Sequence, residues 1–177
     1  ELNISVVIEA GDLSKALNAV HDSLFLSPVK TIHLFLAGTG TIGAELLRQI
    51  AASSDNLRQQ HQLNINVMGI INSRRMVVGN GQPIQADQWE EILFEQGKPA
   101  DMESFVKDIQ QLNLPNSVFV DNTGSTLLPM FYTRLMENHL SVVCCNKTGP
   151  SSDWENYRKL LLTARRHDVA FLYETNV

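Results

Sequence analysis

The 177-residue sequence has few cysteines, no excess of basic residues and no long apolar run. Its two cysteines, Cys144 and Cys145, are adjacent, so we interpret them as buried strand residues in a reducing compartment rather than as a disulfide or metal site. The 14 Lys and Arg against 19 Asp and Glu give a net charge of −5, which argues against a nucleic-acid partner. No stretch reaches the roughly 20 apolar residues of a membrane span, and none has the pattern of a secretory signal. We expect a cytoplasmic protein without a membrane partner.

The hydrophobic share of 44% and the charged share of 19% are those of an ordinary globular protein. The sequence begins at Glu1 without a methionine and ends at Val177 directly after a strand-like segment. From these two ends we expect a piece of a longer protein.

Apolar runs alternate with helix-forming segments from residue 31 onwards. The expected strands are 31–37, 64–72, 117–121, 140–145 and 169–173, and the expected helices are 41–53, 89–93, 102–112, 127–138 and 153–167. Residues 53–61 either close the first helix or extend it as a second one, and residues 73–86 are expected to form a loop. The alternation predicts the α/β class with a doubly wound parallel sheet.

The first 28 residues differ from this pattern. Residues 3–9 alternate as a strand does, and residues 13–25 carry an apolar stripe at helical spacing, which we expect to pack in a core. A clear break follows at 27–28, where serine precedes proline. We therefore divide the chain into a strand–helix piece with a linker at 1–28 and a second unit at 29–177.

The most specific motif is Gly-x-Gly-x-x-Gly at residues 38–43, between a predicted buried strand and a predicted helix. Gly38 permits a tight turn, Gly40 leaves room for a pyrophosphate to approach the backbone, and Gly43 lets the helix pack closely on the strand. The helix N-terminus adds unpaired N–H groups and a partial positive charge. The motif predicts a dinucleotide site in a Rossmann-like fold, against the alternative of a plain glycine-rich turn.

Two arginines follow the second predicted strand, in the sequence Asn72, Ser73, Arg74 and Arg75. No acidic residue is present there to accept a hydrogen bond from a ribose 2′-hydroxyl, whereas guanidinium groups pair with phosphate in a forked geometry. We expect a preference for NADP(H), with NAD(H) as the alternative. One of the arginines can equally be a solvated loop charge.

Small polar residues follow the third strand of the alternation. Thr123, Gly124 and Ser125 would let a nicotinamide-ribose segment lie across the strand end, with Asp121 capping or bracing the loop. A helix-capping turn is the open alternative. Lys147 follows the next strand, where it is placed to face a reacting carbonyl or the cofactor, or to be a surface lysine.

Five motifs together resemble the cofactor domain of homoserine dehydrogenase, and more narrowly that of the bifunctional aspartokinase–homoserine dehydrogenases. They lie at residues 37–43, 69–74, 120–125, 146–147 and 173–177, and their order and spacing are more specific than the glycine turn alone. Residues 3–25 are similar to the last strand and helix of an ACT-type regulatory module. The resemblance therefore extends over nearly the whole chain.

The resemblance implies NAD(P)H-dependent reduction of aspartate 4-semialdehyde to homoserine, on the route to threonine and methionine, in a homo-oligomeric parent protein. Lys147 would supply positive charge near the developing alkoxide. Glu174 and Val177 match positions of a monovalent-cation site, such as one for Na⁺, which is incomplete here. The implied cofactor-binding residues are Gly38, Thr39, Gly40, Thr41, Ile42 and Gly43 at the pyrophosphate, Asn72, Ser73 and Arg74 at the adenosine ribose, Thr123, Gly124 and Ser125 at the nicotinamide ribose, and Asn146 and Lys147 near the nicotinamide.

The family's catalytic lysine and aspartate belong to a domain that would follow residue 177. We therefore expect this chain to bind the nucleotide without turning over substrate. Two other functions stay open from the sequence: another NADP-linked reductase of a semialdehyde or amino acid, and a non-catalytic regulatory nucleotide-binding module.

Overall fold

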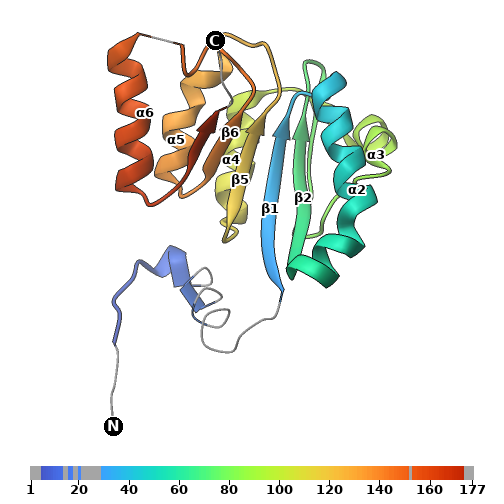
Figure 1. The fold of residues 1–177 in the computed structure, drawn as a ribbon, viewed down its shortest axis with the longest axis horizontal. Coiled ribbons are helices and arrows are strands. Elements are labelled where there is room, and N and C mark those ends of the chain that lie inside the picture. The colour runs from blue at the N-terminus through green and yellow to red at the C-terminus, as the bar shows by residue number, and fades with distance from the viewer. Residues whose placement is uncertain (1–4, 14–15, 18–19, 21–28, 152, 174–177) are drawn as a thin grey trace.

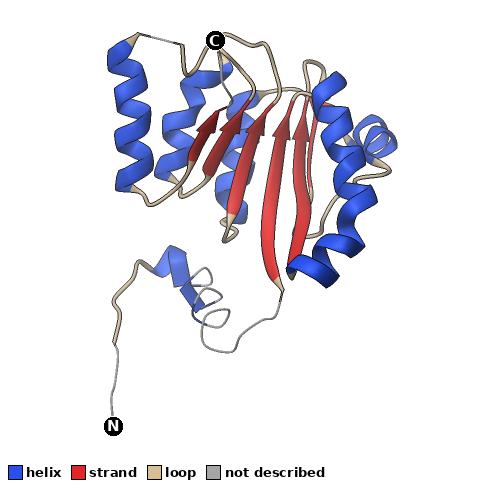
Figure 2. Ribbon diagram, in the orientation of Figure 1, coloured by secondary structure: helices blue, strands red, loops and turns tan. Residues whose placement is uncertain are grey.

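The computed structural model describes residues 5–13, 16–17, 20, 29–151 and 153–173. Within these ranges the chain forms one seven-stranded sheet flanked by helices (Figures 1 and 2). The strands are β1 (Lys30–Ala37), β2 (Leu63–Ile71), β3 (Arg75–Val78), β4 (Lys98–Pro99), β5 (Ser117–Asp121), β6 (Ser141–Cys144) and β7 (Phe171–Tyr173). The helices are α2 (Thr41–His61), α3 (Trp89–Gln96), α4 (Met102–Leu112), α5 (Tyr132–Glu137) and α6 (Trp154–Arg166), with 3-10 turns η1 (Ala10–Asp12) and η2 (Leu128–Phe131).

The strand order β4-β3-β2-β1-β5-β6-β7 places β1 near the middle of the sheet. β1 pairs in parallel with β2 on one side and with β5 on the other, so that Ala37 lies opposite both Ile71 and Asp121. β6 and β7 continue the parallel sheet. The predicted α/β, Rossmann-like sheet is confirmed, and the carboxyl ends of β1 and β5 form the point at which the winding direction reverses.

The sheet is not parallel throughout, because β3 pairs antiparallel with β2 and β4 antiparallel with β3. The prediction of an uninterrupted loop over residues 73–86 is therefore wrong. The four residues of β3 extend the sheet, and two of them are buried, Met76 on one face and Val77 on the other. A strand this short, next to the turn residues 79–81, has too few alternating positions to stand out in the sequence.

Helices cover the two faces of the sheet in two groups. Helices α4, α5 and α6 pack on one face, where Phe35, Phe119 and Tyr132 are completely buried. Helices α2 and α3 pack on the other face, against Leu36 and Ile70. Adjacent residues of β1 thus enter opposite cores, as the period of two in a strand requires.

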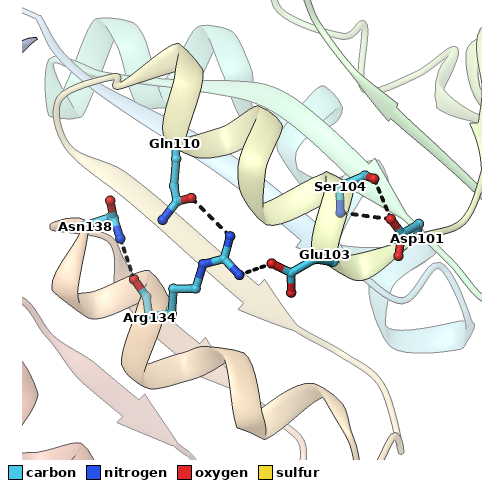
Figure 3. A network of polar contacts seen from close by, with 6 residues as sticks. All are labelled: Asp101, Glu103, Ser104, Gln110, Arg134 and Asn138. Carbon is cyan, nitrogen blue, oxygen red and sulfur yellow. Dashed lines mark hydrogen bonds and ion pairs between the residues drawn. The ribbon is translucent and has the colours of Figure 1, made fainter.

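Helix α4 on the first face begins with a capping hydrogen bond and is joined to α5 by an ion pair. The Asp101 carboxylate accepts a hydrogen bond from the Ser104 N–H at 3.0 Å at the start of α4. Arg134 of α5 pairs with Glu103 of α4 and donates to the Gln110 side chain at 3.3 Å (Figure 3). This contact joins two crossover helices, but it is largely exposed, so buried apolar packing provides more of the stability.

The segment before β1 does not form the predicted strand over its described part. Residues 5–9 have no strand pairing, and the side chains of Val6 and Val7 are 75% and 99% exposed. Residues 13, 16, 17 and 20 are helical, yet Leu13, Leu17 and Val20 stay at least half exposed, so the expected packing of this stripe is not seen. A strand needs a partner to satisfy its backbone groups, and the described chain supplies none there. The rest of 1–28 lies outside the described residues.

No helix in the described part of the chain combines the length and apolarity needed to cross a membrane. Neither cysteine forms a disulfide; Cys144 is buried at the end of β6, as predicted, and Cys145 is half-buried just beyond it. Burial raises the pKa of the Cys144 thiol to about 11.

This pKa predicts that Cys144 is chemically inert in the folded protein. About a thousandth of the thiol is ionised at pH 8, so in the C145S variant we expect negligible alkylation by iodoacetamide until denaturant is added. Because the folded pKa lies above that of a free thiol, this group's contribution to stability is complete below about pH 8.5 and is lost as the pH rises through about 11. Equal labelling rates with and without denaturant would contradict the prediction.

Candidate functional site

The glycine turn after β1 packs against backbone on two sides. Gly38 has a φ of +91°, and a Cβ there would lie 2.8 Å from Cγ2 of Thr123 and 2.9 Å from the carbonyl oxygen of Asn122. A Cβ at Gly43 would lie 1.9 Å from the carbonyl oxygen of Gly38. Both positions therefore require glycine for the turn, the loop after β5 and the start of α2 to meet.

Gly40 is different, because a Cβ there would have no neighbouring atom within 4 Å. Internal packing thus gives no reason for this glycine, and the open space beside it is where a pyrophosphate would approach the backbone. Gly40 is also the N-cap of α2, and no side chain caps the helix. Thr41 and Ile42 are exposed at this end of the 21-residue helix, where the first-turn N–H groups have no partner within the helix and the helix dipole is positive. This arrangement suits an anionic ligand.

Asn72 connects the turn after β2 to the glycine turn. Its Oδ1 accepts hydrogen bonds from the N–H groups of Arg74 and Arg75, both at 2.8 Å, and its Nδ2 donates to Oγ1 of Thr39 at 3.3 Å. The side chains of Ser73 and Arg74 are exposed at the tip of this turn. Asn72 therefore shapes the backbone of the turn on which the predicted 2′-phosphate contacts lie.

The two arginines of this turn are held differently. Nη1 of Arg75 donates to the carbonyl oxygens of Phe94 at 2.7 Å and Gly97 at 3.1 Å, and the guanidinium lies 5.4 Å from the centre of the Phe94 ring. No described residue makes a hydrogen bond or ion pair with the Arg74 side chain. Arg75 thus anchors the end of α3, and Arg74 is the arginine available to a ligand.

The loop after β5 is organised by side chains that bond to its own backbone. Oδ1 of Asp121 accepts a hydrogen bond from the Thr123 N–H at 2.7 Å, and Oγ1 of Thr123 accepts one from the Ser125 N–H at 3.2 Å. The Ser125 hydroxyl accepts from the N–H groups at 127 and 128, where the loop leads into η2. Gly124 is exposed, and a Cβ there would meet nothing within 4 Å. The exposed part of this loop is therefore at Gly124.

Asn146, at the end of β6, is 2% exposed and has hydrogen bonds on both sides of its amide. Nδ2 donates to Oδ2 of Asp121 at 3.0 Å and to the carbonyl oxygen of Ser125 at 2.7 Å, and Oδ1 accepts from the Thr148 N–H at 3.0 Å. Lys147 beside it is exposed, and its ammonium group has no ion pair among the described residues. Asn146 therefore ties two loops together, while Lys147 is the group free to face a ligand.

These contacts bring most of the predicted site residues to one edge of the sheet. The glycine turn contacts the loop after β5 at Thr123 and the turn after β2 at Asn72. Asn146 joins the loop after β6 to the loop after β5. Glu174 and Val177, predicted for a monovalent cation, lie outside the described residues. Over the described ranges, no three His, Cys, Asp or Glu side chains come together as a metal site would need.

Asn122 adds a feature that the sequence did not indicate. Its Nδ2 is buried without a hydrogen-bond partner, at the carboxyl end of β5 and beside Gly38. A buried donor of this kind is costly unless a ligand or water satisfies it. With the open space at Gly40 and the free Arg74, this donor makes the edge fit a phosphate-bearing dinucleotide.

Tyr132 is the second residue that sequence reasoning missed. Its hydroxyl donates to Oδ2 of Asp121 at 2.6 Å, and both residues are completely buried. A tyrosine in an apolar helical stripe predicts only a buried core residue. Nothing in the sequence indicates that its hydroxyl bonds to a carboxylate 11 residues earlier.

Comparison with known proteins identifies the family of this chain. A family model described as "Homoserine dehydrogenase, NAD binding domain" matches residues 38–174. The chain belongs to this homoserine dehydrogenase family. The bifunctional aspartokinase/homoserine dehydrogenase 2 of Arabidopsis thaliana chloroplasts is 33% identical over the whole chain, which covers 19% of that protein. The corresponding bifunctional enzyme of Buchnera aphidicola is also 33% identical, over 99% of the chain and 21% of its own length.

The chain thus spans about a fifth of the length of these curated homoserine dehydrogenase relatives. Solved homoserine dehydrogenases share its fold. The Thermoplasma acidophilum enzyme has a TM-score of 0.62 at 22% identity, covering 82% of this chain and 43% of that one. A hyperthermophilic archaeal enzyme in complex with NADPH has a TM-score of 0.66 at 18% identity, covering 84% of this chain and 45% of that one.

The glycine geometry predicts stability effects of different size for two alanine substitutions. G43A should lower the free energy of unfolding by about 1–3 kcal/mol, because the new methyl group overlaps the Gly38 carbonyl and the backbone must shift. G40A should change it by less than about 1 kcal/mol, since the added atom enters open space. Urea denaturation of both variants measures the difference, and equal losses would contradict it.

Proposed function

We propose that this chain is the NADP-preferring cofactor domain of an enzyme that reduces aspartate 4-semialdehyde to homoserine. The observation that carries the proposal is the edge at the carboxyl ends of β1 and β5. There Gly40 has open space at the uncapped start of α2, and the buried Nδ2 of Asn122 has no hydrogen-bond partner. Membership of the homoserine dehydrogenase family and the names of the bifunctional relatives support the substrate.

The preference for NADP rests on Arg74. Its guanidinium is exposed and free of described partners, at the turn that follows β2, and no acidic side chain stands in that turn. A guanidinium can pair with a 2′-phosphate through two parallel N–H···O bonds, which a 2′-hydroxyl cannot offer. NADPH is also the cofactor named for the hyperthermophilic archaeal relative.

The other site residues take their roles from their positions in the described structure. Residues 38–43 would face the pyrophosphate, Asn72 and Ser73 the adenosine ribose, and Thr123 with Gly124 the nicotinamide ribose. Ser125 and Asn146 act mainly by holding the loops, because their polar atoms already bond to protein groups.

The nicotinamide ring, when bound, supplies the hydride that reduces the aldehyde carbon. Lys147 lies at the carboxyl end of β6 with a free ammonium group, where its charge would stabilise an oxygen that becomes negative. Proton delivery and most substrate contacts belong, in this proposal, to a further part of the longer protein.

The proposal extends to that longer protein. Its relatives are named bifunctional aspartokinase/homoserine dehydrogenases, so we assign the parent to threonine and methionine biosynthesis. Residues 1–28 would be the end of an ACT-type module, and 29–177 the cofactor domain. Glu174 and Val177 would contribute to a monovalent-cation site that residues beyond 177 complete.

Substituting Arg74 tests the cofactor preference. R74A should weaken NADPH binding about tenfold and leave NADH binding within about twofold, because only the 2′-phosphate loses its partner. R75A is the matched control. Because Arg75 bonds to the end of α3, this variant should lower the free energy of unfolding by about 1 kcal/mol and change the ratio of NADPH to NADH affinity little. Fluorescence titration of both reduced cofactors measures these values. Tighter binding of NADH than of NADPH by the unsubstituted chain would refute the preference.

A second test concerns catalysis by this chain alone. We expect the purified chain to bind NADPH but to show no formation of NADPH from homoserine and NADP⁺, because the proposal assigns proton delivery and most substrate contacts to a further part of the longer protein. Absorbance at the nicotinamide band follows the reaction, and a longer version of the protein serves as the positive control. Turnover by the chain alone would contradict the proposed division of roles.

A further inference from the structure

A completely buried carboxylate lies directly beneath the proposed nicotinamide end of the site. Asp121, the last residue of β5, is 0% exposed, and each of its oxygens accepts hydrogen bonds. Oδ1 accepts from the Thr123 N–H, and Oδ2 accepts from the Tyr132 hydroxyl at 2.6 Å and from Nδ2 of Asn146 at 3.0 Å. A carboxylate in this environment is tolerable only while these donors stay in place.

The donors come from three different parts of the chain. Thr123 belongs to the loop after β5, Tyr132 begins α5, and Asn146 belongs to the loop after β6. Burial and the adjacent Asp121 carboxylate raise the pKa of Tyr132 far above its usual range, so its hydroxyl remains a donor. The carboxylate therefore fixes the relative positions of both loops that would face the nicotinamide half.

Two glycines carry this constraint to neighbouring parts of the site. The Thr123 methyl group would lie only 2.8 Å from a Cβ at Gly38, so the loop held by Asp121 packs directly against the glycine turn. Gly149, in the loop after β6, lies against the Tyr132 ring so closely that a Cβ there would be 2.8 Å from Cε2. Lys147 lies in the short segment between Asn146 and Gly149, and both ends of that segment are thereby held.

The adenosine side of the site is built separately. Asn72 forms its turn through bonds to the N–H groups of Arg74 and Arg75 and to Thr39, and none of these bonds involves Asp121, Tyr132 or Asn146. A change at the buried carboxylate should therefore disturb one half of the cofactor site and leave the other half in place.

We propose that Asp121 and Tyr132 are positioning residues for the nicotinamide half of the cofactor, acting through the loops that carry Thr123, Gly124 and Lys147. The inference rests on the proposed function, since it assumes that a dinucleotide occupies this edge. It assigns a functional role to two buried side chains that would not themselves touch the cofactor.

The decisive experiment compares two ligands. NADPH carries both halves, whereas 2′,5′-ADP carries the adenosine ribose with its 2′-phosphate and lacks the nicotinamide half. In D121N an N–H₂ group replaces one acceptor oxygen and faces a donor. We expect NADPH to bind about tenfold more weakly and 2′,5′-ADP to stay within about twofold of the unsubstituted chain.

Two further variants keep the test decisive if D121N folds poorly. Y132F keeps the ring that packs on Gly149 and removes one donor, so we expect NADPH binding to fall about threefold, again without a change for 2′,5′-ADP. S117A is the matched control at the other end of β5, where the Ser117 hydroxyl donates to the Leu114 carbonyl at 2.8 Å. It should leave the ratio of the two affinities unchanged.

The outcomes separate the inference from the proposed function. If D121N and Y132F weaken both ligands equally, or weaken neither, the side chains are only structural and the inference is overturned. If the unsubstituted chain binds neither NADPH nor 2′,5′-ADP, the proposed function fails, and this inference fails with it. A selective loss of NADPH binding in both variants, and not in S117A, supports the inference.

Discussion

A carboxylate removed from water has to be compensated inside the protein, and Asp121 meets this requirement with a backbone N–H, a tyrosine hydroxyl and an asparagine amide. Leaving such a group without its donors costs several kcal/mol, a large part of the stability of a domain of this size. The loops after β5 and β6 therefore cannot move independently of α5. The shape of the nicotinamide half of the edge at which a cofactor would bind depends on this one buried group.

Close backbone packing adds a second constraint at the same edge. Gly38 and Gly43 leave no room for a side chain, so β1, α2 and the loop after β5 approach each other directly. In contrast, Gly40, Gly124 and the side chain of Arg74 face open space. A rigid frame with a few open positions is what a binding site for an extended, charged ligand needs, because the loops are ordered before the ligand arrives.

The elements that could be predicted from the sequence are those with a strong local signal. β1 and α2 follow from an apolar run, a spaced glycine motif and a helix-forming segment, and the position of the site follows from the carboxyl ends of parallel strands. β3 could not be predicted in this way, because four residues next to a turn carry little periodicity. The strand expected before residue 10 has the right alternation, yet alternation cannot form a strand without a partner strand.

The two arginines after β2 show the same limit within the site. Both have the chemistry to bind a phosphate, and only the packing of α3 directs Arg75 to the carbonyl oxygens of Phe94 and Gly97 and leaves Arg74 free. Asn146 likewise suits a cofactor contact by its type and place, but its amide already bonds to Asp121 and Ser125.

The sequence by itself determined the α/β class, the glycine turn and its family, because these depend on residue types at fixed spacing along the chain. The tertiary structure alone decided which polar groups remain free for a ligand. That choice depends on contacts between residues far apart in sequence, such as Asp121 with Asn146 and Arg75 with Phe94, and hydrogen bonds used inside the protein are not available outside it.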